Sequence, residues 1–444
     1  MFDSLFDAIR DQIDGAGGGT GSGGGSGTTG AAVDSGLDEF QPDGSGTLPL
    51  AFGRHIVAGQ LIQQSYTEGP PPVNKLAIAL GEGEWEAAET VSWAGTDLSV
   101  SPDASTAGYR FYPGGITQAV DAFFSGGLTY SSTAYVAMRL TEAQSAENVT
   151  DKHRGIYQCL LVPDYNIAGV ETDAGSYSVN PARVIAYGAK NAKTVFGTET
   201  DLLHRIHWPS WQRLKEYCAE TISWNDGSST RSIARFEAHP VWVNQVSFPA
   251  FMDAVCFLCG ATWQDDSTLI RFLLPTDQTP VHHFELGVNS NTSSFKAKPI
   301  TLRERITKLT VKFRDLDDDD LKPATLTIER PKLADLYGEN AQELAIANCN
   351  QSQARRIGEM WMRLTSDYVQ RADLDGYADS WHVLPGDYVT VTAPPVGWDR
   401  QLCKATAATD LSTSTTADRR VFTVQKIDGP VYSDADQQPI QVQE

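Results

Sequence analysis

Three closely spaced glutamates are the first side chains in this sequence with the chemistry of a catalytic site. Glu82, Glu84 and Glu86 would lie on one face of an extended segment, because side chains alternate along a strand. Two carboxylates in different environments can hydrolyse a glycosidic bond. The sequence shows neither a substrate cleft nor a feature that would separate their pKa values. We therefore predict a turn with solvated acids, and hydrolysis is the alternative.

A Cys-x-x-Cys pair has the spacing of a metal site. Cys256 and Cys259 lie within an apolar helical pattern, and the sequence has no second pair. A zinc or iron–sulfur site normally needs four ligands, commonly from two such pairs. The candidate companions are Cys218, His239, His282 and His283. We predict small buried cysteines rather than ligands, and free thiols throughout, because the cysteines are scattered through a long chain with no secretory signal.

An acidic run and a His-x-x-His pair also have the residue types of a metal site. Asp315–Asp320 reads DLDDDD, but an EF-hand that began at Asp315 would need Gly at 320 and Glu at 326, where Asp320 and Leu326 stand. A looser cation site is the alternative to a solvated loop tip, which we predict. His204 and His207 are interpreted as a pair on a polar helix face. We predict no cofactor, no metal and no catalytic residue.

Composition and charge restrict the classes of function. The 444 residues, 41% hydrophobic and 20% charged, predict a folded protein of two to four domains. A net charge of −21 argues against binding a nucleic-acid backbone, and it suits a wall past which DNA slides. Acidity for solubility alone explains the charge equally well. We find neither a secretory signal nor an apolar run of about 18 residues.

The first thirty residues have the pattern of an anchor on a flexible linker. Met1–Asp14 predicts an amphipathic helix, and Gly15–Gly30 consists almost entirely of Gly, Ser and Thr. A helix this short is marginal in water, so we expect it to form by docking on a neighbouring subunit or on another protein of the same assembly. A frayed terminus without a role is the alternative. The apolar residues at helical spacing are Phe2, Leu5, Phe6, Ile9 and Ile13.

From residue 48 onward the pattern indicates short strands broken by Gly and Pro, with a few helices. We predict an α+β, mainly β, multidomain chain of antiparallel β-barrel or sandwich domains with a smaller α+β domain. Leu48–Ile62 and Leu76–Trp93 are each expected to form two strands, the first pair with a turn at Gly53-Arg54 and the second with a tight connection after Leu80. The other expected strands include Tyr109–Pro113, Ala134–Leu140, Gly155–Val162, Leu269–Leu274, Leu309–Phe313, Tyr388–Thr392 and Arg420–Ile427. The expected helices include Gly115–Ser125, Trp211–Thr221, Phe251–Leu258 with Ser247 as cap, and a longest helix within Gln342–Tyr368. The predicted divisions are 1–14 (docking helix), 15–47 (linker), 48–200 (β-rich), 201–300 (α+β) and 301–444 (β-rich with one long helix).

Several of these segments resemble one protein family. Leu76–Val100, with Gly81-Glu82-Gly83-Glu84, resembles the "GEGEI" segment of tail-tip hub proteins of long-tailed bacteriophages, the host-specificity or tip attachment family of lambda-like phages. Leu48–Ile62 resembles the family's "YGRxRVGG" opening. Further similar segments follow in the family's order. They are Thr133–Leu140, Asn180–Gly197, Ala234–Leu274, Asn350–Leu364 and Val383–Val391.

The resemblance implies a structural virion protein without enzymatic activity. The implied protein is a trimeric hub at the distal tail tip, with tube-protein-like β domains, which caps or lines the tail tube. Its implied partners are distal tail or tube proteins, the tape measure protein, and tail fibre or receptor-binding proteins. DNA would pass through the channel without specific binding. A peptidoglycan-degrading tail component and a receptor-binding adhesin are the alternatives.

Overall fold

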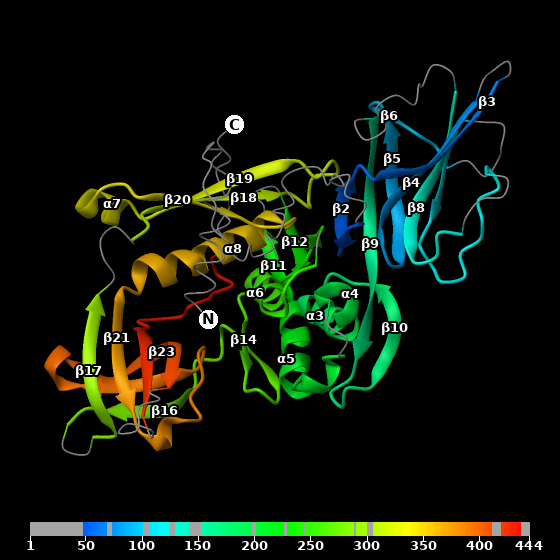
Figure 1. Cartoon of the computed structure of the whole chain (residues 1–444). Helices are drawn as coiled ribbons and strands as arrows, with labels where there is room; N and C mark the ends of the chain where they lie inside the picture. Colours follow the sequence, from blue (N-terminus) through cyan, green and yellow to red (C-terminus); the bar gives the residue numbers. More distant parts are fainter. Residues whose placement is uncertain are drawn as a thin grey trace, which may run out of the picture.

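The computed structural model describes most of the chain after its first 47 residues. The described residues are 48–68, 73–100, 107–124, 129–141, 152–197, 201–225, 229–243, 245–287, 290–299, 305–410 and 419–436. The predicted docking helix at Met1–Asp14 and the linker behind it therefore lie outside the described residues. Figure 1 shows a β-rich module at one end, helices at the centre, and a small sheet and a second β-rich module at the other end.

The first module is a β-sandwich. One sheet has the order β3-β4-β8-β7, and the other has the order β10-β9-β5-β6 with β2 paired to β9. Leu76, Ile78 and Leu80 alternate along β4 and join Trp85 and Tyr157 of the opposite sheet in one core. The strands are β2 (Arg54–Val57), β3 (Gln60–Thr67), β4 (Val73–Glu82), β5 (Trp85–Trp93), β6 (Thr96–Asp97), β7 (Gly108–Tyr112), β8 (Thr133–Thr141), β9 (His153–Tyr165) and β10 (Glu171–Tyr177).

The tight connection predicted after Leu80 is present, although it does not make a hairpin. β4 ends at Glu82 and β5 begins at Trp85, but the two strands belong to different sheets. Gly83 has a φ of 83°, in the left-handed region that glycine adopts without a steric penalty. The turn therefore carries the chain from one layer of the sandwich to the other.

The helix predicted at Gly115–Ser125 is wrong over Gly115–Phe124, the part that is described. This segment is an irregular loop on the outer face of β4 and β8, where Phe123 and Phe124 are buried together. Side-chain bonds replace helical ones: Gly114 N donates to Gln118 Oε1 (2.6 Å), and Asp121 accepts from Phe123 N and from the Tyr112 hydroxyl. Such local bonds offer the backbone an alternative to a helix.

The central module packs helices against short hairpins. Asn180 caps α3 by accepting from Ala182 N, and Ser247 caps α6 by accepting from Ala250 N, the latter as predicted. The helices are α3 (Pro181–Lys190), α4 (Ala192–Phe196), η1 (Leu203–Arg205), α5 (Trp208–Ala219) and α6 (Phe248–Leu258). The strand pairs are β1 (Leu50–Ala51) with β13 (Val241–Trp242), β11 (Thr221–Asn225) with β12 (Thr230–Ala234), and β14 (Thr262–Asp265) with β15 (Ile270–Leu273).

A small sheet lies on the longest helical segment. Leu309, Val311 and Phe313 alternate inward along β18, as predicted, and α8 passes beneath them (Figure 1). The sheet order is β19-β18-β20, and β18 and β20 are parallel. The elements are β18 (Lys308–Arg314), β19 (Pro323–Glu329), α7 (Pro331–Tyr337), β20 (Ala341–Ala345), α8 (Gln351–Met362) and the π-helical extension η2 (Arg363–Asp367).

The last module is a curved six-stranded sheet with its own core around Leu374, Val389 and Phe422. Its order is β16-β22-β23-β24-β21-β17, so the consecutive strands β16 and β17 form its two edges. The β16–β22 pair is parallel, in contrast to the antiparallel pattern expected. The elements are β16 (Pro280–Glu285), β17 (Thr292–Pro299), β21 (Gln370–Gly376), η3 (Ala378–Ser380), β22 (Tyr388–Ala393), η4 (Pro394–Val396), β23 (Trp398–Asp410) and β24 (Arg420–Lys426).

The predicted fold class is therefore confirmed: the chain is mainly β, with antiparallel sandwich and curved-sheet modules and a smaller α+β part. β9 connects the first module to the centre, because its first half pairs with β2 and β5 and its second half pairs with β10 beside the helices (Figure 1). Among the residues that can be described, no helix is long and apolar enough to cross a bilayer.

A substitution at Gly188 in α3 tests how closely the helices of the central module pack. An added Cβ would lie 2.6 Å from Phe251 Cζ in α6, so Gly188→Ala must displace a buried ring. Ala favours the helix by about 1 kcal/mol, but overpacking costs about 1–3 kcal/mol. We expect a net loss of about 1–2 kcal/mol in the free energy of unfolding, measured with urea. The control is Gly188→Ala combined with Phe251→Leu, where the alanine should cost little; an equal loss in both backgrounds would contradict this packing.

Candidate functional site

The three glutamates do not form a carboxylate pair in a shared cleft. Glu82 is half-buried at the end of β4, Glu84 is exposed in the turn, and Glu86 is exposed in β5. Burial raises the pKa of Glu82. Glu82 borders a cavity of about 630 Å³ together with Lys193 and Trp242, whereas the other two glutamates are not among the lining residues. The geometry is that of a turn flanked by two exposed acids, Glu84 and Glu86, whereas Glu82 is half-buried rather than solvated as predicted.

The Cys-x-x-Cys pair is buried in the central core. Cys218, Cys256 and Cys259 are all buried free thiols, and Cys259 Sγ donates to the carbonyls of Val255 (3.7 Å) and Cys256 (3.3 Å). Burial raises the pKa of Cys218 and Cys256 well above its usual value, so both stay protonated. In the part of the chain that is described, no group of three or more His, Cys, Asp or Glu side chains could hold a metal ion.

The histidines that were weighed as ligands have other places in the fold. His207 caps α5, because its side chain accepts from Ser210 N, while His204 is exposed in η1. His282 and His283 lie in β16 of the last module, where His283 Nδ1 contacts Thr390 Oγ1 (2.8 Å). His239 lies at a boundary between modules, and Arg54 N donates to its Nδ1 (2.9 Å). The structure therefore separates these side chains rather than bringing them together.

The acidic loop Asp315–Leu321 is anchored between modules, although several of its carboxylates reach solvent. Leu321 is fully buried and packs with Leu316 against Ile56 and Ile156 of the sandwich. The Arg54 guanidinium donates to the carbonyls of Leu316 and Asp319 (both 3.3 Å), and it forms an ion pair with Glu89 (2.7 Å). The loop thus fixes the small sheet to the sandwich.

His55 is the buried centre of this boundary. Its Nε2–H donates to the Phe52 carbonyl (2.9 Å), and its Nδ1 accepts from Asn348 Nδ2 (3.2 Å). Asn348 Nδ2 also donates to the Arg54 carbonyl (2.7 Å). Burial, with His239 nearby, lowers the pKa of His55 to about 3. The imidazole is therefore neutral at physiological pH, and a second proton would face the Asn348 amide.

The N-terminal turn of α8 ties the central module to the end of the chain. Gln353 is fully buried, and its amide donates to the carbonyls of Glu237 (2.8 Å) and Leu258 (3.0 Å) and accepts from Glu237 N (3.0 Å). One turn later, the fully buried Arg356 donates to the Tyr432 hydroxyl (2.7 Å). These bonds join three segments that are far apart in the sequence.

The C-terminal segment, residues 432–436, is bonded to the central module. Arg235 of the central module binds Asp434 through two hydrogen bonds (3.2 and 2.9 Å) and Glu220 through a third (2.7 Å). Arg363, just after α8, pairs with Asp436 (2.7 Å). With Arg356 on Tyr432, residues 432–436 are therefore held by three arginines.

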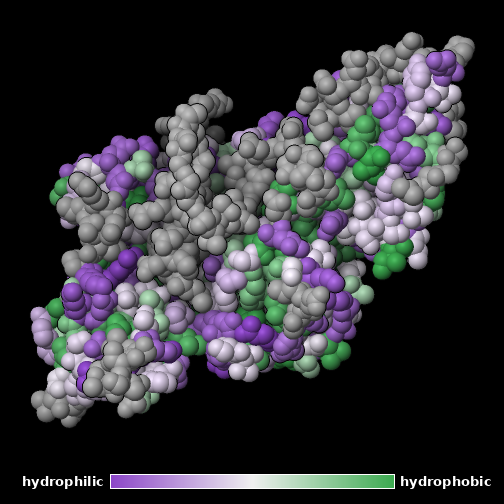
Figure 2. All heavy atoms as spheres, viewed as in Figure 1, coloured by the Kyte–Doolittle hydropathy of each residue, from purple (hydrophilic) through white to green (hydrophobic). Residues whose placement is uncertain are grey.

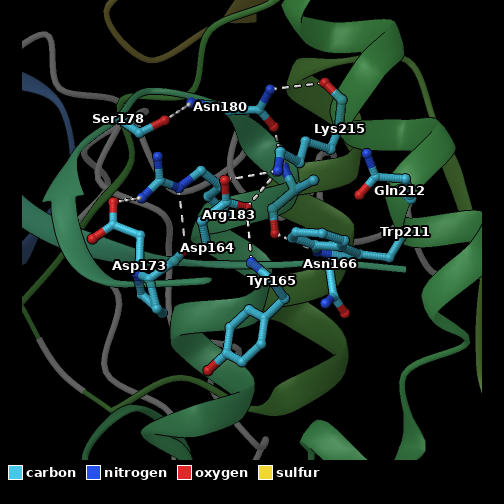
Figure 3. Close-up of polar contacts among 12 residues, drawn as sticks. Asp164, Tyr165, Asn166, Asp173, Ser178, Asn180, Arg183, Trp211, Gln212 and Lys215 are labelled. Carbon is cyan, nitrogen blue, oxygen red and sulfur yellow. Dashed lines mark hydrogen bonds and ion pairs between the residues drawn. The ribbon is translucent and has the colours of Figure 1, made fainter. Parts of the chain in front are cut away.

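A polar network joins the β9–β10 hairpin to the central helices, and Figure 3 shows it. Lys215 of α5 binds both carboxylate oxygens of Asp164 (2.6 and 2.7 Å). Arg183 of α3 donates to the Pro163 carbonyl (3.1 Å) and pairs with Asp173 (3.3 Å). Asn180 Nδ2 donates to the Lys215 carbonyl (2.9 Å), so the α3 cap also contacts α5. The hairpin, α3 and α5 are thereby locked in one arrangement.

The last module meets the central one through polar bonds as well. Gln264 in β14 donates to Asp387 Oδ1 (2.8 Å) and to the Pro385 carbonyl (3.1 Å). Lys404 in β23 donates to Thr262 Oγ1 (3.2 Å), and burial lowers the pKa of Lys404 to about 8. Pro385 lies in the turn before β22.

Exposed apolar side chains are distributed over all modules. On the face shown in Figure 2, hydrophobic residues form separate patches between hydrophilic ones. The exposed large apolar residues are Tyr66, Val100, Ile116, Val120, Ile167, Val170, Val281, Leu336, Tyr337, Tyr377, Trp381 and Val396. Several of these neighbour one another on a loop or a short helix, as Ile116 and Val120 do, and such projecting groups are candidates for contacts with other proteins.

Comparison with known proteins identifies a shared fold but no related sequence. No protein-family model matches the chain, and no curated protein sequence matches it. A protein in the virion of a native gene transfer agent particle is 15% identical, with a TM-score of 0.62, and the match covers 99% of this chain and 97% of that one. This likeness extends over the full length of both chains and shows a shared fold.

Two further solved structures are more distant. A tail protein from Neisseria meningitidis MC58 is 10% identical, with a TM-score of 0.36, covering 88% of this chain and 99% of that one. A prophage tail protein, gp18, from Listeria monocytogenes EGD-e is 12% identical, with a TM-score of 0.28, covering 84% and 90%. At these scores the two structures add no argument of their own. The structural neighbours described are thus virion and tail proteins.

Acid should weaken the boundary around His55. Between pH 6.5 and about 3 the unfolded chain protonates this histidine and the folded chain does not, so stability falls as pH falls, by up to about 1.4 kcal/mol per pH unit. We expect His55→Gln to lose about 1–2 kcal/mol less than the wild type between pH 7 and pH 5 in urea unfolding. His204→Gln, at an exposed histidine, is the control. If the His55 variant lost as much unfolding free energy between pH 7 and pH 5 as the wild type, this residue would not carry the effect.

Proposed function

We propose that this protein is the central hub at the distal tip of a phage-like tail, a structural virion protein without enzymatic activity. The observation that carries the proposal is the full-length likeness to a protein of a gene transfer agent virion. The ordered segments between residues 48 and 430 that resemble tail-tip hub proteins support it independently. The net charge of −21 suits a channel wall along which DNA slides.

In this proposal three copies surround a passage that closes or lines the end of the tail tube. The upstream partners are distal tail or tube proteins and the tape measure protein, and the downstream partners are tail fibre or receptor-binding proteins. The N-terminal anchor attaches the chain to a neighbouring tail protein. The parts of the hub follow the predicted divisions at residues 14, 47, 200 and 300, except that α3 and α4 belong with the central α+β part and β16 and β17 with the last β-rich part. Assembly takes place in the host cytoplasm, and the mature location is the virion.

The module boundaries support a hub that opens by rearrangement. Polar bonds at His55, Gln353, Arg235 and Gln264 hold the modules, and hydrogen-bonded boundaries can exchange one set of partners for another. Opening of the passage would then be a switch between two packed arrangements. The separated positions of Glu82, Glu84 and Glu86 support the non-enzymatic reading over a peptidoglycan-degrading role.

Electron cryo-microscopy of purified particles tests the hub directly. We expect three copies at the distal end of each tail, and quantitative mass spectrometry should give about three copies per particle. Many copies along the shaft would contradict the proposal. A zymogram on cell-wall substrate, with Glu84→Gln as the control, tests the enzymatic alternative: clearing by the wild type that the variant loses would establish hydrolysis instead.

A further inference from the structure

A small apolar pocket opens where the central module, α8 and the last module meet. Its free volume is about 50 Å³, room for the end of one apolar side chain. Its apolar lining comes from Phe257, Pro275, Met360, Trp361, Leu364 and Val431. Phe257 is half-buried and makes an edge-on contact with the ring of Trp361, with 5.9 Å between centroids.

The polar groups of the pocket are few. Lys404 is its basic lining residue and Asp253 its acidic one, and Asp253 already accepts a hydrogen bond from Trp263 Nε1 (2.6 Å). An apolar occupant flanked by carboxylates would suit this lining, since its ring would fill the cavity and its acids would face an ammonium group.

The sequence contains a segment with this chemistry. Met1–Asp14 has Phe2 and Phe6 on its apolar side, and four aspartates with one arginine elsewhere. Phe6 lies beside Asp7 and three residues after Asp3, so an inserted Phe6 ring would bring carboxylates to the mouth of the pocket. The apolar side chains of this segment need a surface that shields them from water. Its aspartates favour a surface that carries a cation.

The connecting chain has a matching length. Residues 15–47 give a typical span of about 29–34 Å for a flexible linker. Leu48 and Val246 border the same cavity, and α6 starts two residues after Val246. α6 rises about 16 Å along its axis, and the pocket includes Cys256, Phe257 and Gly260 at its far end. The path from Leu48 therefore crosses that cavity and the length of α6, and a linker of this typical span is long enough to cover both.

We propose that Met1–Asp14 of the free chain binds this pocket of the same chain, with the Phe6 ring as the inserted group. A neighbouring tail protein would have to compete with the pocket for the anchor, so the segment would be held until assembly. This inference does not depend on whether the assembled protein is a hub.

Disulfide trapping in the full chain tests the contact. Phe6→Cys combined with Phe257→Cys should form an internal disulfide under mild oxidation at least ten times faster than Phe6→Cys combined with Tyr66→Cys, because Tyr66 is exposed on β3 and lies away from the pocket. Phe6→Cys alone reports any reaction with the buried native cysteines, and mass spectrometry identifies the linked peptides. Equal rates for the two pairs would overturn the proposal. A mixture of isotope-labelled and unlabelled copies separates internal from intermolecular links, and mainly intermolecular links would also overturn it.

Hydrogen exchange provides a test that leaves the folded modules unaltered. In the full chain, Phe2→Ser with Phe6→Ser should speed amide exchange several-fold around Phe257 and Trp361 while leaving β24 unchanged. The matched control is Asp11→Ser with Asp14→Ser, which keeps both rings and should change exchange little. Unchanged exchange at the pocket in the double Phe variant would show that the anchor does not bind there.

Discussion

Buried polar groups must find partners once water is excluded, and in this chain many of them find partners in another module. Gln353 has no contact with solvent, and all three bonds of its side-chain amide reach backbone atoms of the central module. An unpaired amide at such a site would cost about 1–3 kcal/mol. The modules are therefore interdependent, because each supplies hydrogen-bond partners for polar groups that are buried in its neighbour.

The same requirement accounts for part of the distribution of charge. Arg54, Arg183, Lys215 and Arg235 bind carboxylates or carbonyls at boundaries between modules or layers. Cations are the less numerous charges in a chain with 35 basic and 56 acidic residues. The acidic residues in excess give the chain its net charge of −21, and a surface of this sign repels a nucleic-acid backbone.

Local patterns could be predicted from the sequence, whereas distant pairings could not. The alternation of Leu309, Val311 and Phe313 predicts a strand, and Ser247 before an apolar run predicts a helix cap. Both features depend on residues only a few positions apart in the sequence. The apolar pattern at Gly115–Phe124 is misleading, since Phe123 and Phe124 fill the outer face of a sheet rather than one side of a helix. The contact of His55 with Asn348 spans 293 residues, and periodicity carries no information about such a pair.

The continuity of β9 has a mechanical consequence. One uninterrupted strand pairs with the sandwich along its first half and with β10 beside the helices along its second half. A pull that separates these two bodies along the strand axis loads the ladder bonds in shear, so that many bonds resist together. A twist between the bodies loads instead the side-chain contacts of Arg183 and Lys215, together with the apolar core that the two bodies share. We therefore expect backbone bonds to resist tension along the strand and side-chain packing to resist torsion.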